Sequence, residues 1–281
     1  MKIFKIKSYA KINLALNVIK KTHKLHKIES IISFIDLYDL IYLKKIKKKN
    51  HKISFRGKFS KNIYKKNTVT NLIQLLEKKN FLDNQKFEIT IIKNIPQQAG
   101  MGGGSMNAAS LINFFIKKKL INLNKKELLK LTSQIGSDVI LGIEPNNTIL
   151  SSNGNIKRYK KNIKLHTLVV KPTFGCSTKY VYSKVRLFSK PQFSFPKQTM
   201  FQTKYLKILN NDLEIIVFKK HPRLKKIKSF LSIMPKNIFV RMSGSGSSIV
   251  AYFPSKSTCD YAYRQFKRNF NSHWCIVSKT I

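Results

Sequence analysis

A glycine-rich stretch in the first half of the chain constrains its fold more than any other feature. It reads PQQAGMGGGSMNAA from Pro96 to Ala109, and four of the chain's 11 glycines lie within five of its positions. A strand-like run over residues 87–93 precedes the stretch, and a helix-like apolar run over residues 108–116 follows it. Glycine lets backbone N–H groups converge on an anion, and a helix N-terminus adds free donors and a partial positive charge. The order of strand, glycine turn and helix therefore predicts a phosphate-binding loop rather than a flexible turn.

The loop differs from two common nucleotide-binding patterns. A P-loop has a lysine directly after its last glycine, but Gly104 is followed by Ser105 and Met106. The dinucleotide pattern G-x-G-x-x-G would begin at Gly100 and would need a third glycine where the chain has Ser105. Neither a Walker site nor a dinucleotide-binding fold is indicated.

The chain is extremely basic, with 55 Lys+Arg against 12 Asp+Glu and a net charge of +43. Such a charge is typical of nucleic-acid-binding proteins. However, the basic residues are overwhelmingly lysine, which lacks arginine's bidentate fork, and they are spread along the chain with a surplus of Ile and Asn. These are the residues of A/T-rich codons. We therefore expect no specific nucleic-acid partner, although the charge would attract anionic ligands.

Other residue types indicate a cytoplasmic protein without a membrane partner. No run approaches the ~18 apolar residues that span a bilayer, and residues 1–7 alternate like a strand rather than a signal peptide. Cys176, Cys259 and Cys275 fit free thiols in a reducing compartment. No metal site is expected, because no carboxylate or thiol completes a set with His23 and His26.

Hydrophobic periodicity predicts two α+β units with a boundary near residues 155–165. The first is expected to hold strands over 2–7, 12–19, 28–47 and 87–95, and helices over 68–77, 105–119 and from Asn124 to Gly136. The second is expected to hold strands over 165–171, 239–242, 248–253 and 274–278, and helices over 178–184, 203–216, 223–233 and 259–270.

Three sites could carry chemistry. Asp138 follows a predicted helix end and precedes an apolar run, so it is a candidate general base, or equally a cap of the next helix. Lys11 enters an apolar strand, although residue type and position alone favour a surface lysine at a strand edge. The turn Ser243–Ser247 is either a second anion or sugar contact or a hairpin turn.

Three separated segments together resemble the GHMP kinases, the small-molecule kinase family of galactokinase, homoserine kinase, mevalonate kinase and phosphomevalonate kinase. The stretch from Pro96 to Ala109 matches the family loop P-x-x-A-G-L-G-G-G-S-S-N-A-A almost throughout. Residues 10–14 (AKINL) match the family's first motif, and residues 242–248 (MSGSGSS) match its third. The order and spacing agree over essentially the whole chain.

The resemblance implies an α+β fold of two domains. An N-terminal ATP-binding domain like domain 2 of ribosomal protein S5 would span residues 1–158, and a ferredoxin-like α/β domain would span residues 159–281. The triple glycine, the AKINL segment and residues 136–139 (GSDV) resemble most the branch that acts on a cytidine-diphosphate-linked methylerythritol in non-mevalonate isoprenoid synthesis. The implied reaction is transfer of the γ-phosphoryl of ATP to the 2-hydroxyl of that substrate, with Mg²⁺ held mainly through phosphates, by a monomer or homodimer.

The family's functional residues map onto this sequence as follows. Lys11 and Asp138 match the catalytic pair. The implied ATP-binding residues are Pro96, Gln97, Gln98, Ala99, Gly100, Met101, Gly102, Gly103, Gly104, Ser105 and Met106, with Asn67 lining the adenine pocket. The implied substrate-binding residues are Asn13, His26, Thr178, Tyr182, Gly244 and Ser245, with His26 contacting the cytosine and Tyr182 stacking on it.

Three departures from the family pattern stand out. Leu25 replaces a tyrosine beside His26, and because base–aromatic stacking contributes ~1–3 kcal/mol, we expect weaker binding of the cytidyl substrate. Met106 replaces a serine in the loop, and Ile140 replaces a proline after the Asp-Val pair. A kinase for mevalonate-type or homoserine substrates is the alternative within the family, and a basic RNA-binding protein is the alternative outside it.

Overall fold

The structure is a computed structural model that describes residues 2–23, 25–161 and 163–281. The chain forms two compact units, each assembled from several segments. Unit 1 comprises Met1–Lys11, Leu37–Pro96 and Gly102–Pro145, and unit 2 comprises Ile12–Asp36, Gln97–Met101 and Asn146–Ile281. The proposed division into consecutive domains 1–158 and 159–281 stays a prediction about the sequence.

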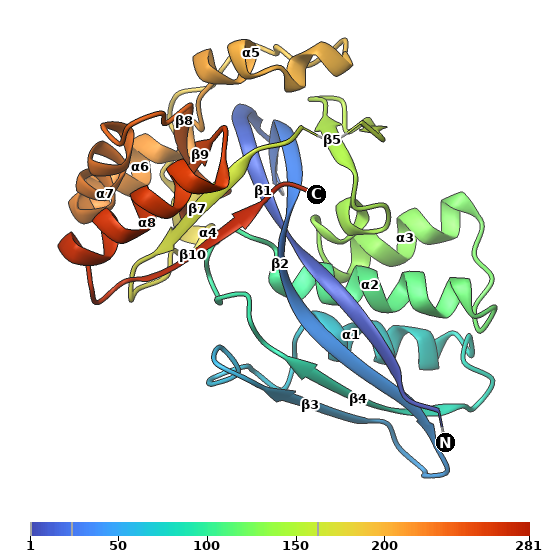
Figure 1. Ribbon diagram of the computed structural model, residues 1–281. Coiled ribbons are helices and arrows are strands. Elements are labelled where there is room, and N and C mark those ends of the chain that lie inside the picture. The colour runs from blue at the N-terminus through green and yellow to red at the C-terminus, as the bar shows by residue number, and fades with distance from the viewer. Residues whose placement is uncertain (1, 24, 162) are drawn as a thin grey trace. The chain divides into compact units, whose positions relative to one another are not determined.

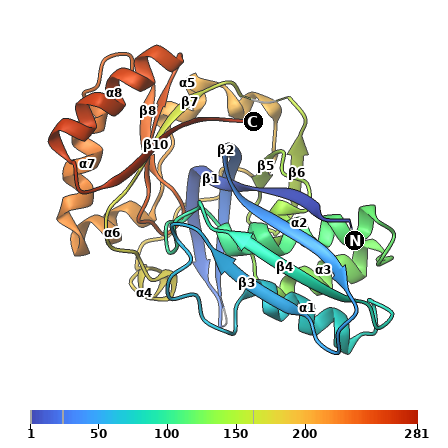
Figure 2. The same cartoon turned by 60° about the horizontal axis from the view of Figure 1, so that its bottom comes forward.

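Unit 1 packs three helices against strands of a mixed sheet. The sheet order is β3-β4-β2-β5-β6, with β1 (Phe4–Lys21) paired to β2 (His26–Ile46), and unit 1 contains β3 (Lys52–Arg56) and β4 (Lys86–Ile92). β3 and β4 run parallel, side by side in Figure 2, and α1 (Thr68–Lys78) connects them. α1, α2 (Gly103–Lys117) and α3 (Lys125–Ile135) lie together along this part of the molecule (Figure 1). Their apolar faces share one core with β2 and β4, which includes Ile41, Leu72, Ile89, Ile112 and Leu131.

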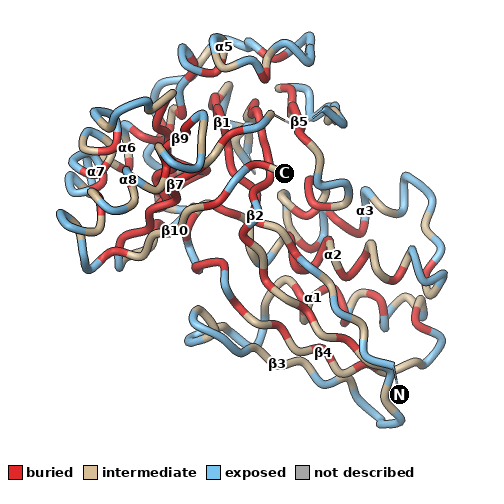
Figure 3. The backbone as a smooth tube through the Cα atoms, viewed as in Figure 1, coloured by how far each residue is buried: buried red, intermediate tan, exposed pale blue. Residues whose placement is uncertain are grey.

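The first strand is longer than the sequence patterns predicted. The strands expected over 2–7 and 12–19 are one strand, β1, because the buried Ser8 and Ala10 continue the sheet through the intervening residues. Every residue of the stretch from Ala10 to Val18 is buried (Figure 3). The strand expected over 28–47 is confirmed as β2. The short strands β3, β5 (Asn147–Leu150) and β6 (Ile156–Tyr159) were not predicted, because four or five residues give little periodic signal.

Unit 2 contains a four-stranded antiparallel sheet in the order β10-β7-β9-β8. Its strands are β7 (His166–Lys171), β8 (Phe239–Met242), β9 (Ile249–Phe253) and β10 (Trp274–Lys279). α7 (Pro222–Ser232) and α8 (Lys256–Asn269) share a core with the sheet through side chains such as Ile227, Phe266 and Ala251. The first strand of this sheet lies between the fourth and the third, which is the ferredoxin-like arrangement that the family resemblance implied.

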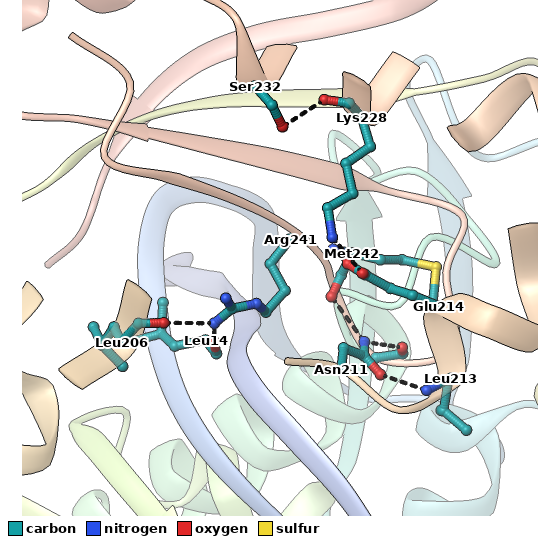
Figure 4. Close-up of polar contacts among 10 residues, drawn as sticks. Leu14, Leu206, Asn211, Leu213, Glu214, Lys228, Ser232, Arg241 and Met242 are labelled. Carbon is teal, nitrogen blue, oxygen red and sulfur yellow. Dashed lines mark hydrogen bonds and ion pairs between the residues drawn. The ribbon is translucent and has the colours of Figure 1, made fainter. Parts of the chain in front are cut away.

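One predicted helix is wrong. Residues 203–216 were expected to form a single helix, but α5 (Thr203–Ile208) and α6 (Leu213–Lys220) are separate. The segment between them hydrogen-bonds to β1 instead: Leu16 N donates to Asn210 O at 3.0 Å, and Asp212 N donates to Leu16 O at 2.9 Å. The side chain of Asn211 then donates to Met242 O and Gly244 O, each at 2.8 Å (Figure 4 shows this side chain beside Met242). These tertiary bonds replace the helical ones that local sequence favoured.

The remaining elements of unit 2 are short. They are α4 (Thr178–Ser183) and the 3₁₀ helix η2 (Gln198–Phe201), while unit 1 holds the 3₁₀ helix η1 (Val139–Gly142). Throughout the part of the chain that the structure describes, each helix is too short or too polar to cross a membrane.

Candidate active site

In unit 1, the glycine loop places two charged side chains at the start of α2. The helix begins at Gly103, and Gly102 before it adopts a left-handed conformation with φ of 65°. A Cβ at Gly102 would lie 3.0 Å from Cγ of Lys11 and 3.7 Å from Oδ2 of Asp138. Only glycine therefore combines this backbone conformation with such a close approach to the two side chains.

Lys11 and Asp138 form an ion pair, with Lys11 Nζ 3.2 Å from Asp138 Oδ2. The Lys11 side chain is 6% exposed, whereas the Asp138 side chain is 35% exposed, so the carboxylate remains accessible to a substrate. Asp138 precedes η1, but its side chain makes no capping hydrogen bond among the described residues. The structure therefore answers two questions that residue patterns left open: Lys11 is not a surface lysine, and Asp138 is not a helix cap.

The N-terminus of α2 supplies backbone N–H groups. Among the described residues, no side chain caps this helix, whose first turn closes when Met106 N donates to Gly102 O at 2.9 Å. The Met106 side chain is buried, and a Cβ at Gly142 would lie 2.9 Å from its Sδ, so Met106 packs against the last residue of η1. Ser105 is partly exposed at the same helix start. The first turn of α2 can therefore bind an anion through main-chain donors.

Asn67, predicted to line the adenine pocket, is the N-cap of α1. Its Oδ1 accepts from Val69 N and Thr70 N, and its Nδ2 donates to Tyr64 O at 2.9 Å. The next residue, Thr68, donates its hydroxyl to Gly104 O at 2.7 Å. The start of α1 is thus bonded directly to the glycine loop, and an adenine contact by Asn67 stays a prediction.

In unit 2, the preceding part of the loop packs on the turn Ser243–Ser247. Ser243 Oγ donates to Gly100 O at 2.9 Å, and Ser247 N donates to Gln98 O at 3.3 Å. Gly100 has φ of 72°, and a Cβ there would lie 1.9 Å from Ser243 O, so no other residue fits. Gln98 is exposed, whereas Ala99 is buried. The other loop residues, Pro96 and Met101, are buried, and Gln97 is exposed.

The predicted substrate-binding residues of unit 2 gather around the same turn. Asn13 N donates to Ser243 Oγ at 3.2 Å, and a Cβ at Gly244 would lie 3.4 Å from Asn13 Oδ1. The hydroxyls of Thr178 and Ser245 are 2.8 Å apart. Asn13, Thr178, Gly244 and Ser245 therefore form one polar cluster with the loop residue Gly100.

His26 and Tyr182 form a separate aromatic pair in unit 2. Their ring centroids are 5.2 Å apart with an interplanar angle of 41°. Burial, with a smaller contribution from Lys21, holds the pKa of His26 below its usual value. Its imidazole is therefore neutral at pH 7, with one ring nitrogen free to accept a hydrogen bond. Leu25, which replaces a tyrosine of the family pattern, is 70% exposed next to this pair.

Two further residues hold the loop, and the sequence patterns did not indicate either of them. Ser243 bonds both Asn13 and Gly100, yet it was considered only as part of a glycine turn. Asp39 is fully buried and bonds residues on both sides of the loop, but the apolar pattern of its strand does not predict such a role. One signal in the sequence could have identified Asp39: it is an acidic residue within an apolar strand, in a chain with 12 acidic residues.

The fold and the loop define a class of protein. The family model of the GHMP kinases N-terminal domain matches residues 67–145, and that of the GHMP kinases C-terminal domain matches residues 204–272. The chain belongs to the GHMP kinase family. It is accordingly an ATP-dependent small-molecule kinase.

Two relatives are similar to the chain over nearly its full length. The chain is 63% identical over 281 residues to the 4-diphosphocytidyl-2-C-methyl-D-erythritol kinase of Pelagibacter ubique, covering 100% of both chains. It is 33% identical to the protein of that name from Clostridium tetani, covering 99% of this chain and 100% of the relative.

Solved structures share the fold. A crystal structure of 4-(cytidine 5'-diphospho)-2C-methyl-D-erythritol kinase has a TM-score of 0.79 at 20% identity, covering 99% of this chain and 100% of that one. Homoserine kinase from Cytophaga hutchinsonii has a TM-score of 0.73 at 15% identity, covering 100% of this chain and 95% of that one.

Proposed function

We propose that this kinase transfers the γ-phosphoryl of ATP to the 2-hydroxyl of 4-diphosphocytidyl-2-C-methyl-D-erythritol, in non-mevalonate isoprenoid precursor synthesis. The single observation that carries the chemistry is the ion pair of Lys11 and Asp138 beside Gly102, at the start of α2. The full-length similarity to a relative of that name, at 63% identity, supports the choice of substrate.

Unit 1 supplies the groups that a phosphoryl transfer requires. Asp138 would orient the acceptor hydroxyl and take its proton, because its carboxylate is partly exposed and fixed by an ion pair. The Lys11 ammonium would stabilise negative charge on the transferred group. The N–H groups at the start of α2 would bind the phosphates of ATP.

Unit 2 supplies contacts for the cytidyl part of the substrate. Tyr182 would stack on the cytosine, and the neutral His26 would accept from or donate to its polar edge. Asn13, Thr178 and Ser245 are amide and hydroxyl groups that can bond the sugar or diphosphate oxygens.

Mg²⁺ is the expected companion of ATP. Within the described residues, no three His, Cys, Asp or Glu side chains gather into a metal site. A Mg²⁺ ion bound with ATP needs few protein ligands, because phosphate oxygens and water would hold it. Such an ion would neutralise phosphate charge. We further propose a cytoplasmic bacterial enzyme acting as a monomer or homodimer; the bacterial sources of its relatives support a bacterial origin.

The decisive experiment incubates the purified protein with MgATP and the cytidyl substrate. ADP release and the mass of the product report the reaction, and phosphorus NMR distinguishes a new phosphomonoester. Parallel reactions contain mevalonate or homoserine. We expect turnover of the cytidyl substrate alone, with competitive inhibition by CDP. Turnover of mevalonate or homoserine instead would overturn the proposal, as would salt-sensitive RNA binding without any ATP turnover.

A further inference from the structure

A buried carboxylate in unit 1 bonds both sides of the glycine loop. Asp39 lies on β2 and has an exposed fraction of 0%. Asn94 N and Ile95 N each donate to its Oδ1 at 2.8 Å. Lys93 Nζ pairs with its Oδ2, and Asn107 Nδ2 donates to the same oxygen at 3.0 Å. This one side chain therefore accepts four hydrogen bonds.

The four donors lie at the two ends of the phosphate-binding loop. Lys93, Asn94 and Ile95 connect the end of β4 to the glycines of the loop, whereas Asn107 lies in the first two turns of α2, after the last of these glycines, Gly104. Asp39 itself belongs to neither flank, because it comes from a different strand. The carboxylate thus fixes the point where the loop leaves the sheet relative to the point where the helix begins.

The Asp39 carboxylate also offsets the positive charge of Lys93 near the start of α2. Lys93 Nζ would lie 3.3 Å from a Cβ at Gly103, the first residue of α2. A bare ammonium there would oppose the partial positive charge of the helix N-terminus, and the Asp39 carboxylate offsets it. Lys93 and Asn107 are themselves buried, with exposed fractions of 4% and 1%. Loss of the carboxylate would therefore leave two buried donors without this partner, which is costly.

We propose that Asp39 is a positioning residue for ATP: its carboxylate holds the glycine loop in the conformation that binds the phosphates. This inference rests on the proposed role of the loop in ATP binding. The alternative is a buried ion pair that contributes to folding alone. The two differ in what they predict for nucleotide affinity in a variant that still folds.

The test compares Asp39→Asn with Asp36→Asn, an exposed acid on the same strand. Asparagine keeps the shape of the side chain but replaces one acceptor oxygen by a donor. We expect Asp39→Asn to raise both the Kd of MgATP, measured by calorimetry, and the KM for ATP by tenfold or more. The KM for the cytidyl substrate should change less than twofold, and Asp36→Asn should match the wild type.

A second variant covers the case in which Asp39→Asn fails to fold. Asn107→Ala removes one donor from the Asp39 carboxylate and leaves the ion pair with Lys93 in place. We expect a three- to fivefold rise in the Kd of MgATP. An unchanged Kd in both folded variants, or equal rises in the KM of ATP and of the acceptor, would overturn the positioning role. Because the Kd is measured without turnover, an inactive wild type that binds ATP would contradict the proposed function and leave this test intact.

Discussion

At the residue scale, the environment of a side chain decides its role more than its type does. Lys11 is one lysine in a chain with 55 Lys+Arg, and its sequence position favours a solvated strand edge. In the structure its ammonium is buried and paired with Asp138, which comes from a segment more than a hundred residues away in the sequence. Burial and pairing distinguish this lysine from the exposed ones on the same strand, such as Lys5.

We expect Asp138→Asn and Lys11→Ala each to lower kcat by ~10²-fold or more, because each removes a group that acts on the transferred phosphoryl or its acceptor. MgATP binding should remain detectable by calorimetry, since the loop N–H groups are retained. Lys5→Ala on the same strand is the control and should retain wild-type turnover. Near-normal kcat in either variant would remove that residue from the proposed chemistry.

At the scale of elements, two helices begin with the same kind of N-terminal cap but differ in their contact with the glycine loop. α1 is capped by Asn67 and α3 by Asn124, and each cap forms a reciprocal capping box. Among the described residues, the start of α1 bonds the glycine loop, through Thr68 and Gly104, whereas the start of α3 does not. The same local signal thus stabilises both helices, while its effect on the phosphate site depends on tertiary contacts.

Asn67→Ala and Asn124→Ala form a matched pair that separates these effects. Each should lower the free energy of unfolding by about 1 kcal/mol in urea titrations, the usual cost of losing an N-cap. Only Asn67→Ala should also raise the KM for ATP, because the start of its helix is bonded to the loop and because Asn67 is itself predicted to line the adenine pocket. An Asn67→Asp variant keeps an acceptor for the cap and should recover stability. Equal effects of both alanine variants on KM would contradict the link between α1 and the loop.

At the scale of the whole molecule, the net charge of +43 is spread along the chain rather than concentrated in one segment. Basic residues occur on strands, helices and turns alike, as expected from compositional drift. Even so, a field of one sign attracts an anionic substrate and nucleotide over distances beyond direct contact. The charge should therefore influence the rate at which these ligands bind and leave the chemical step unaffected.

Raising NaCl from about 20 mM to about 200 mM should lower kcat/KM for the cytidyl substrate several-fold, because salt screens the attraction. kcat at saturating substrate should stay nearly constant. The measurement is a series of steady-state assays at fixed free Mg²⁺, with sucrose of matched osmolality as the control. A kcat/KM that is independent of salt would show that the charge does not assist binding.

Local signals in the sequence were sufficient to predict most helices and strands and the phosphate-binding loop. Glycines at 100 and 102–104, flanked by a strand and a helix, predict a phosphate site because their backbone freedom and the helix N-terminus are local properties. Similarly, the caps at Asn67 and Asn124 fix helix starts through neighbours three residues away.

Contacts between distant segments decided the rest. The helix predicted over 203–216 is broken because Asn210 and Asp212 bond β1, which no local pattern shows. Asp39 holds the loop and Lys11 meets Asp138 for the same reason: a buried charge is stable only beside a partner, and the partner's position is set by the fold. The sequence by itself determined that the chain has a phosphate-binding loop, and the tertiary structure determined which charged side chains lie beside it.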